Sequence, residues 1–485
     1  MWLPARSRRV NSNMTPDWTK RLAGTLRRPE ALTLIIILLW ALTSLPHLGT
    51  TGLIWEEGTN AVIARQILTG TDWLPPVVYG VREIDKPYLL AWLIAGVSLV
   101  SGEVTEYAAR TPAIIAVLLT ALLVQSVTRR YANLNASFFA ALAFLFSPML
   151  LQKSRVAEPD TLVTLFSFAA LVVWWNGAEL NRMTIRRWIG CGCILGVGAL
   201  LKGPMPLVFF VFGVTAYAAL ERRWRDMPGL FICLTIPAVV VLAWGIAVYQ
   251  AGDEHSWRSV HSMWARPWRD YFDRNLLAIA QLLLELMPAV LLAPLAVWRG
   301  PASERSPPIV RPLLLYATLS TAIIVVWPGF ASRYVMPIAP AVAVLGGIGW
   351  DAIKRTKFSR LRWLAGGIVT TAVLLKLAYV TIAMSLYPDR FGKTRLDGQA
   401  IERVIRAAPA PVFCTDFATN QLFYVRMPIQ CLSREALASF TAPAWLVIPR
   451  DQLPQIISLR PDLKIDSVTE TTSGASLLAA RAEKR

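Results

Sequence analysis

Long apolar runs alternate with short polar connections between residues 31 and 386. A membrane-spanning helix needs about 20 mainly apolar residues. Eleven runs approach that length, and we interpret them as transmembrane helices: residues 31–49, 110–127, 136–153, 161–177, 187–201, 204–220, 227–250, 276–298, 311–328, 334–352 and 362–386. A twelfth run, 88–101, follows Pro87 and is short for a straight crossing, so we expect it to lie on the membrane or to dip into it.

Composition supports this class, because 55% hydrophobic and 16% charged residues with a mean hydropathy of +0.47 exclude a soluble globular protein. Lys and Arg gather at the N-terminus and in alternate connections, and short loops of this kind are cytoplasmic. If 88–101 crossed the membrane fully, Arg129 and Arg130 would lie on the outer side, and every later basic loop would be on the wrong side as well. The distribution of Lys and Arg therefore predicts that 88–101 does not cross, which leaves the basic residues on the cytoplasmic face. The net charge of +18 therefore indicates anchoring to anionic lipid and not nucleic-acid binding.

The same reasoning predicts three regions. Residues 1–30 form a basic cytoplasmic N-terminus, and 31–386 form a transmembrane domain with outer loops 50–109 and 251–275. The first of these loops contains an amphipathic helix over 60–68. Residues 387–485 alternate short apolar and polar segments and predict a small α/β domain on the outer side. Cys414 and Cys431 lie in this domain, where they form either a disulfide or two free thiols.

Charged residues lie at the outer ends of several predicted spans. They are Glu56, Lys86, Glu158, Asp160, Lys202 and Arg333. Ionisable groups at this depth are costly unless they pair or face a watery cavity, so such a cluster predicts a functional site. A purely structural interpretation remains open for some of the acids: Asp85 can pair with its neighbour Lys86, and Glu57 can stabilise the helix that starts near Gly58. Separate loops that place charges on one side favour the functional site.

An ordered set of short motifs resembles the bacterial GT-C glycosyltransferases related to protein O-mannosyltransferases and to the lipid A aminoarabinose transferase. The motifs are Trp55-Glu56-Glu57, Ile63 to Leu68, Gly70 to Leu74, Asp85-Lys86-Pro87-Tyr88, Ala108 to Pro112, Ser147-Pro148, Glu158-Pro159-Asp160, Gly198 to Pro204 and Ser332 to Pro337. The resemblance covers most of residues 30–352. It implies a polytopic helical enzyme that transfers a sugar from a polyprenyl (undecaprenyl) phosphate, with inversion at the anomeric carbon.

The resemblance also implies roles for single residues. The first-loop acid pair of the family is usually Asp-Glu, and its Asp is regarded as the catalytic or acceptor-orienting carboxylate. Glu56 takes that position here, one methylene longer, with Asp160 as the second acid. Lys86 and Arg333 match groups around the carrier phosphate. The candidate substrate-binding residues are Glu57, Asp85, Lys86, Glu158, Lys202, Arg266, Arg333 and Tyr334.

Positioning and charge can release a phosphate without a metal, so no cofactor is required by this hypothesis. His255 and His261 in the loop 251–275 are the alternative, as ligands of a divalent metal. The aromatic and basic residues of the same loop are explained equally by an interfacial belt. We expect a monomer in the bacterial inner membrane with the active site and C-terminal domain in the periplasm. The acceptor remains open between lipid A or lipopolysaccharide, another glycan and a protein.

A transporter or flippase of lipid-linked or anionic substrates is the competing hypothesis, since it would use the same charges. Transporters of this kind are commonly built from inverted repeats. The sequence shows no such duplication, which favours the enzyme.

Overall fold

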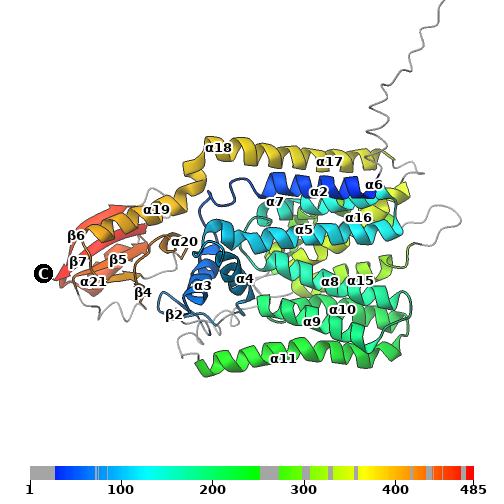
Figure 1. Ribbon diagram of the computed structural model, residues 1–485, viewed down its shortest axis with the longest axis horizontal. Coiled ribbons are helices and arrows are strands. Elements are labelled where there is room, and N and C mark those ends of the chain that lie inside the picture. Colours follow the sequence, from blue (N-terminus) through cyan, green and yellow to red (C-terminus); the bar gives the residue numbers. More distant parts are fainter. Residues whose placement is uncertain are drawn as a thin grey trace, which may run out of the picture.

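A bundle of long helices carries a small sheet domain at one end, and helices α3 (Glu57–Thr69) and α4 (Leu89–Ser98) lie between the two (Figure 1). The computed structural model describes residues 28–70, 74, 76–84, 86–251, 272–297, 306–325, 331–353, 359–414, 419–432, 440, 442–449, 452–470 and 477–484. The expected class, a polytopic α-helical protein with a small C-terminal α/β region, is confirmed.

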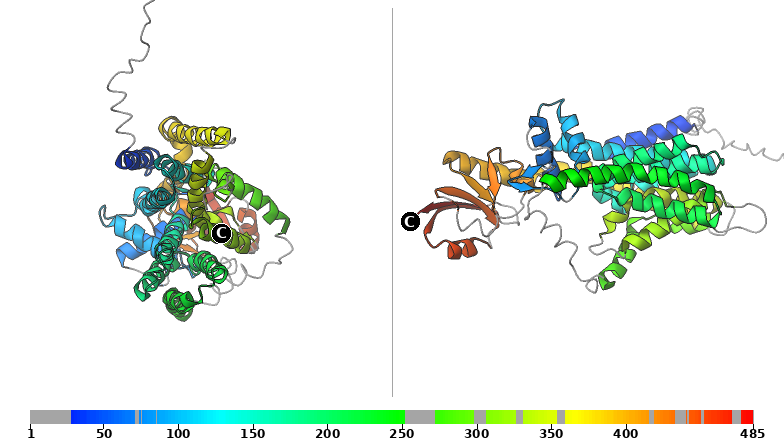
Figure 2. Two further views of the ribbon diagram at one scale, coloured as in Figure 1. Left: turned by 90° about the vertical axis from the view of Figure 1, so that its right-hand side faces the viewer. Right: turned by 90° about the horizontal axis from the view of Figure 1, so that it is seen from below.

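Helices follow the predicted apolar runs closely. The bundle consists of α2 (Pro29–Ser44), α5 (Glu106–Tyr131), α6 (Leu134–Leu145), α7 (Pro148–Lys153), α8 (Asp160–Ala178), α9 (Ile185–Lys202), α10 (Met205–Leu220), α11 (Met227–Ala251), α13 (Phe272–Glu285), α14 (Ala289–Leu292), η3 (Ala293–Ala296), α15 (Val310–Val325), η4 (Ser332–Ile338), α16 (Ala339–Ala352) and α17 (Ser359–Ala378). A π-helical turn, Tyr379–Ala383, and α18 (Met384–Leu386) extend α17. The helices run side by side along the long axis of the molecule (Figure 2).

Several predicted spans differ from simple straight crossings. Among the described residues, five helices are long and apolar enough to cross a membrane, and a sixth span results if the pair Leu277–Glu285 and Ala289–Ala296 counts as one. That pair bends by 93° next to Pro288, where the interrupted backbone ladder allows a break. The predicted span 136–153 is likewise divided into α6 and α7, because Ser147 caps a new helix that begins at Pro148. Two of the eleven predicted spans, 136–153 and 276–298, are therefore each divided into two helices.

Close helix contacts build the core of the bundle. A Cβ on Gly192 in α9 would lie 2.7 Å from the carbonyl oxygen of Cys233 in α11, so these two helices touch backbone to backbone. Small residues allow such an approach between membrane helices. The Tyr217 ring of α10 meets the buried rings of Trp174 and Trp175 of α8 edge-on. This packing joins the last turns of α8 to α10, at the end of α8 opposite Asp160.

Two short elements cover that end of the bundle. Helix α4 has ten residues and is thus about 15 Å long, half of the roughly 30 Å apolar layer of a membrane. It packs against α3, and the stretch of chain that connects the two helices forms the small hairpin of β1 (Val77–Val78) and β2 (Val81–Arg82). α4 therefore does not cross a bilayer by itself.

The C-terminal domain begins with α19 (Pro388–Ala407), which continues from α18. Its five-stranded mixed sheet has the order β4 (Ile429–Cys431), β3 (Val412–Cys414), β5 (Ala444–Pro449), β7 (Leu477–Lys484) and β6 (Leu463–Glu470). The short helices α20 (Thr419–Leu422) and α21 (Leu453–Leu459) complete it. Cys414 of β3 and Cys431 of β4 lie opposite each other and form a disulfide. Of the two alternatives left open by the sequence, a disulfide or two free thiols, the disulfide is confirmed.

Candidate active site

Seven charged side chains meet where the bundle adjoins α3 and α4. They come from the loop before α3 (Glu56), the loop before α4 (Lys86), the end of α7 (Lys153), the α7–α8 connection (Glu158), the start of α8 (Asp160), the end of α9 (Lys202) and η4 (Arg333). Six of these residues are site candidates from the sequence. The fold brings those six together from five separate segments.

Glu56 is the centre of one chain of ion pairs. Its Oε2 accepts from Lys86 Nζ at 2.6 Å, and its Oε1 accepts from Arg333 Nη2 at 3.2 Å. Arg333 Nη1 also lies 3.4 Å from Oε1 of Glu158, whose Oε2 accepts from Lys153 Nζ at 2.7 Å. Positive and negative groups alternate along this series of ion pairs, so each charged group is stabilised by neighbours of opposite charge.

A second pair lies beside the first. Lys202 Nζ donates to Asp160 Oδ1 at 2.6 Å, and the same ammonium lies 4.4 Å from the centre of the Tyr334 ring. The Arg333 guanidinium lies 5.5 Å from the centre of the same ring. A cation close to an aromatic face is stabilised by the ring quadrupole. Tyr334 thus contacts both cations and links the two groups of charges.

Glu56 is the most accessible carboxylate of this cluster. Its side chain is 38% exposed, whereas those of Glu158 and Asp160 are 3% and 5% exposed. Burial raises the pKa of Glu56, but Lys86, Arg333 and Lys202 outweigh it and lower the pKa to about 2. Burial raises the pKa of Glu158 despite the nearby cations. A substrate therefore meets an ionised Glu56, while Glu158 and Asp160 support the cations from behind.

Backbone contacts fix the position of Glu56. Asn60 in the first turn of α3 donates from Nδ2 to the Glu56 carbonyl at 3.0 Å and to the Ala157 carbonyl at 3.1 Å. One side chain thereby joins the loop that carries Glu56 to the connection that carries Glu158. The buried amide of Asn60 therefore fixes how far Glu56 lies from Glu158 in space, although the two residues are far apart in the sequence.

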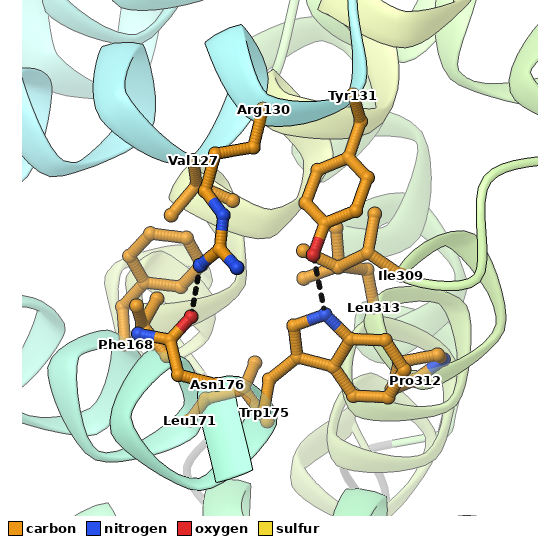
Figure 3. Close-up of a pocket in the computed structure, with 11 residues that line it drawn as sticks. Val127, Arg130, Tyr131, Phe168, Leu171, Trp175, Asn176, Ile309, Pro312 and Leu313 are labelled. Carbon is orange, nitrogen blue, oxygen red and sulfur yellow. Dashed lines mark hydrogen bonds between the residues drawn. The ribbon is translucent and has the colours of Figure 1, made fainter. Parts of the chain in front are cut away.

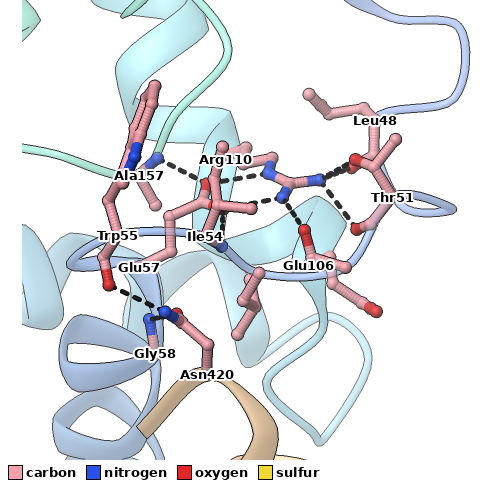
Figure 4. A network of polar contacts seen from close by, with 12 residues as sticks. Leu48, Thr51, Ile54, Trp55, Glu57, Gly58, Glu106, Arg110, Ala157 and Asn420 are labelled. Atoms are coloured by element: carbon pink, nitrogen blue, oxygen red, sulfur yellow. Dashed lines mark hydrogen bonds and ion pairs between the residues drawn. The ribbon is translucent and has the colours of Figure 1, made fainter. Parts of the chain in front are cut away.

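Glu57 differs from the prediction that it binds substrate. Its side chain is fully buried and pairs with Arg110, whose Nε and Nη2 lie 2.8 and 2.7 Å from the two carboxylate oxygens (Figure 4). The backbone N–H groups of Ile54 and Ala157 donate to the same oxygens at 2.9 and 2.8 Å. No surface of this carboxylate is left for a ligand. Glu57 instead holds the loop before α3 onto the bundle.

Four predicted candidates lie outside the described residues, and one residue of the cluster was not predicted from the sequence. Asp85, Arg266, His255 and His261 are not among the residues that the structure describes. Lys153 was missed, although it pairs with Glu158 and its ammonium lies 3.6 Å from the centre of the Trp55 ring. The signal was present, because Lys153 ends an apolar run just before the Glu158 motif.

A small pocket lies toward the other end of α5 and α8. It is lined by Val127, Arg130, Tyr131, Phe168, Leu171, Val172, Trp175, Asn176, Ile309, Pro312 and Leu313 (Figure 3). Its polar groups satisfy one another, since Trp175 Nε1 donates to the Tyr131 hydroxyl at 2.9 Å and Arg130 donates to Asn176. The helical rise along α8 puts Asn176 about 24 Å from Asp160. This pocket is separate from the charged cluster.

Comparisons with known proteins agree with this architecture. A family profile described as dolichyl-phosphate-mannose-protein mannosyltransferase matches residues 85–246. An undecaprenyl phosphate-alpha-4-amino-4-deoxy-L-arabinose arabinosyl transferase of Pseudomonas aeruginosa is 27% identical over 386 residues, which are 75% of this chain and 67% of the relative. A protein of the same name from Edwardsiella ictaluri is 26% identical over 309 residues, 60% of this chain and 55% of the relative.

Solved structures extend the likeness to the whole fold. The apo crystal structure of ArnT from Cupriavidus metallidurans has a TM-score of 0.65 at 15% identity, covering 96% of this chain and 98% of the other. The structure of the same protein bound to undecaprenyl phosphate also has a TM-score of 0.65, at 16% identity and with 93% and 97% coverage. The chain therefore shares the fold of this multi-span membrane protein along nearly its whole length. The chain is thus similar to the protein mannosyltransferase family over residues 85–246 and to the aminoarabinose transferases over three quarters of its length.

Proposed function

We propose that this protein transfers a sugar from a polyprenyl (undecaprenyl) phosphate carrier to an acceptor at the outer, periplasmic face of the bacterial inner membrane, with inversion at the anomeric carbon. The observation that carries the proposal is the cluster of ion pairs around the exposed Glu56 at the end of the apolar bundle. The names of the relatives support the carrier. Lipid A or lipopolysaccharide, which the motif resemblance to the lipid A aminoarabinose transferase suggests, is the first acceptor to test, before other glycans and proteins.

The charge of the cluster suits a lipid-linked sugar phosphate. Among the residues that the structure describes, the cluster has the four cations Lys86, Lys153, Lys202 and Arg333 and the three carboxylates Glu56, Glu158 and Asp160, an excess of one positive charge. A sugar attached through a phosphodiester carries one negative charge and would neutralise it. Because all seven side chains come from one chain, we expect a monomer to be the active unit.

Lys86 and Arg333 would bind the phosphate. Without a bound donor, both form ion pairs with Glu56, and their side chains are 21% and 26% exposed. Charge-assisted hydrogen bonds from lysine and arginine to phosphate are strong. When the donor phosphate recruits these cations, Glu56 loses the partners that lower its pKa and becomes a stronger base. Donor binding thus prepares the carboxylate for proton transfer.

The reaction then needs one displacement. The acceptor oxygen forms a bond to the anomeric carbon as the bond from that carbon to the phosphate oxygen breaks, with its electron pair remaining on the phosphate. The acceptor proton passes to Glu56, and the carrier leaves as a polyprenyl phosphate monoester. Lys86 and Arg333 stabilise the second negative charge that develops on the phosphate. Asp160 keeps Lys202 in place beside them.

We further propose that this reaction does not require a metal. The four cations of the cluster supply the positive charge that would otherwise come from a divalent ion. A chelator would then leave the rate of donor consumption unchanged, whereas loss of activity that a divalent salt restores would show that a metal takes part.

The test is an assay of the purified protein with a panel of polyprenyl-phosphate sugars, starting with the 4-amino-4-deoxyarabinose carried by the relatives' donor. Release of polyprenyl phosphate and glycosylation of the acceptor are both measured. We expect turnover of one donor, and a loss of about 10²–10⁴-fold in kcat for Glu56→Gln. Glu221→Gln is the matched control, because it removes a carboxylate from a surface pair with Arg311 away from the charged cluster. If all variants bind or move the lipid between leaflets without consuming it, the protein is a transporter.

A further inference from the structure

A short segment of the C-terminal domain, residues 419–426, contacts the loop that carries Glu56, in addition to contacts of α19 with residues 49–52 of the same loop. Asn420, Phe423, Tyr424 and Arg426 of this segment each contact a residue between 53 and 106. The disulfide between Cys414 and Cys431 closes the stretch of chain that contains the segment. The domain is therefore tied to the candidate active site at the place where Glu56 is held.

Asn420 grips the backbone on both sides of Glu56. Its Oδ1 accepts from the Gly58 N–H at 2.9 Å, and its Nδ2 donates to the Trp55 carbonyl at 2.9 Å (Figure 4). Trp55 has a φ of 51°, in the left-handed region that a bulky residue rarely adopts. Such a conformation persists only when surrounding contacts hold it. Asn420 supplies one such contact directly beside the catalytic carboxylate.

Gly58 permits this grip. A Cβ on Gly58 would lie 2.7 Å from both the Asn420 nitrogen and the Thr419 carbonyl carbon, so the start of α3 and α20 touch without a side chain between them. Any larger residue would push the asparagine away from the loop. The close approach of two backbones makes the position of Asn420 relative to Glu56 narrowly defined.

Two further contacts keep the segment in register. The Tyr424 hydroxyl accepts from the Leu53 N–H at 3.0 Å and donates to Glu106 Oε1 at 3.0 Å. Arg65 of α3 donates to the Phe423 carbonyl at 2.9 Å, and its guanidinium lies 4.2 Å from the centre of the Phe423 ring. These contacts involve residues before and after Trp55–Gly58 in the sequence and resist displacement of Asn420 along the loop.

We propose that Asn420 is a positioning residue for Glu56, so that the C-terminal domain sets the geometry of the catalytic carboxylate. This inference rests on the proposed function, because it assigns the base role to Glu56. Asn420 does not touch the charged side chains of the cluster in these contacts. It acts through the backbone of Trp55 and Gly58.

Kinetics of purified full-length variants test the role. Asn420→Ala should lower kcat about 10–100-fold, since a small misplacement of a catalytic group has a cost of this size, and leave the donor KM within about threefold. Asn420→Asp keeps the volume and the acceptor for Gly58 but loses the donor to Trp55, so it should also lower kcat. A side chain that only fills space would tolerate this isostere. Gln421→Ala, next to it on α20, is the control and should keep wild-type kcat.

A double variant asks whether Asn420 acts through Glu56. Adding Asn420→Ala to Glu56→Gln should cause little further loss, because the misplaced group is already inactive. If the two losses multiply, Asn420 does not work through Glu56 and the inference is wrong.

Hydrogen exchange of a peptide that spans residues 53–60 decides the question without any substrate. The Gly58 amide, now donated to Asn420, should exchange several-fold faster in Asn420→Ala than in wild type or Gln421→Ala, whereas Asn420→Asp keeps an acceptor for this amide and should leave its exchange near the wild-type rate. Unchanged exchange of the Gly58 amide in Asn420→Ala would overturn the positioning role, whatever the kinetic results. If exchange rises in Asn420→Ala but the wild-type protein turns over no donor, Asn420 positions the loop but the proposed sugar transfer is wrong.

Discussion

Replacing Glu57 by glutamine is expected to destabilise the protein by about 3–5 kcal/mol, because it leaves the Arg110 guanidinium charged and unpaired in the interior. The two side chains are 0% and 4% exposed, so water cannot replace the lost partner. Glu57 accepts four hydrogen bonds, two from Arg110 and two from the backbone of Ile54 and Ala157. Glutamine keeps the shape but directs an N–H₂ group at one of these donors, which alone costs about 1–3 kcal/mol.

The assay is the free energy of unfolding from chemical denaturation in detergent, with thermal unfolding as a second probe. Glu103→Gln is the control, since it breaks an ion pair with Arg426 whose side chains are 54% and 66% exposed. Exposed pairs contribute about 0–1 kcal/mol. Arg110→Met combined with Glu57→Gln should be less destabilised than the sum of the single changes by about 1–3 kcal/mol. Equal effects of Glu57→Gln and Glu103→Gln would refute the view that Glu57 anchors the loop by a buried charge.

Three further outcomes follow from the same structure. Lys86→Met should raise the donor KM about 10-fold or more with a smaller change in kcat, as expected when a charged hydrogen bond to the phosphate is lost; an unchanged KM in the steady-state assay would remove Lys86 from the phosphate site. The pKa of Glu56 is lowered to about 2 from 4.5, so the stability from its ionised form is complete above about pH 4.5 and is lost as the pH falls toward 2. The difference in melting temperature between wild type and Glu56→Gln should therefore be constant from about pH 6 to 8 and shrink below about pH 4.5, and a change between pH 6 and 8 would contradict the lowered pKa. Replacing Cys414 and Cys431 together by alanine should destabilise the C-terminal domain by about 3 kcal/mol, because the disulfide closes a sequence separation of 17; proteolysis that cuts residues 387–485 no faster than in wild type would argue against this.

The helical bundle and the site residues could be predicted from sequence because their signals are local. An apolar run of sufficient length has few stable arrangements other than a helix in a membrane or a buried helix. The charges at the ends of these runs are conspicuous for the same reason, since each carries a desolvation cost that demands a partner. Breaks within runs were harder to predict. Pro288 and the Ser147 cap interrupt the backbone pattern while the apolar character continues.

Sequence alone therefore determined the class of protein, the order of its helices and a set of charged residues that includes Glu56, Lys86 and Arg333. Tertiary structure decided what each charge does. Glu56 and Glu57 are adjacent, yet one faces cations 30 and 277 residues away while the other is enclosed by Arg110. Whether a carboxylate is accessible or buried depends on which distant segments pack around it, and no local pattern encodes that packing. The grip of Asn420 on the loop, 362 residues from Gly58, has the same origin.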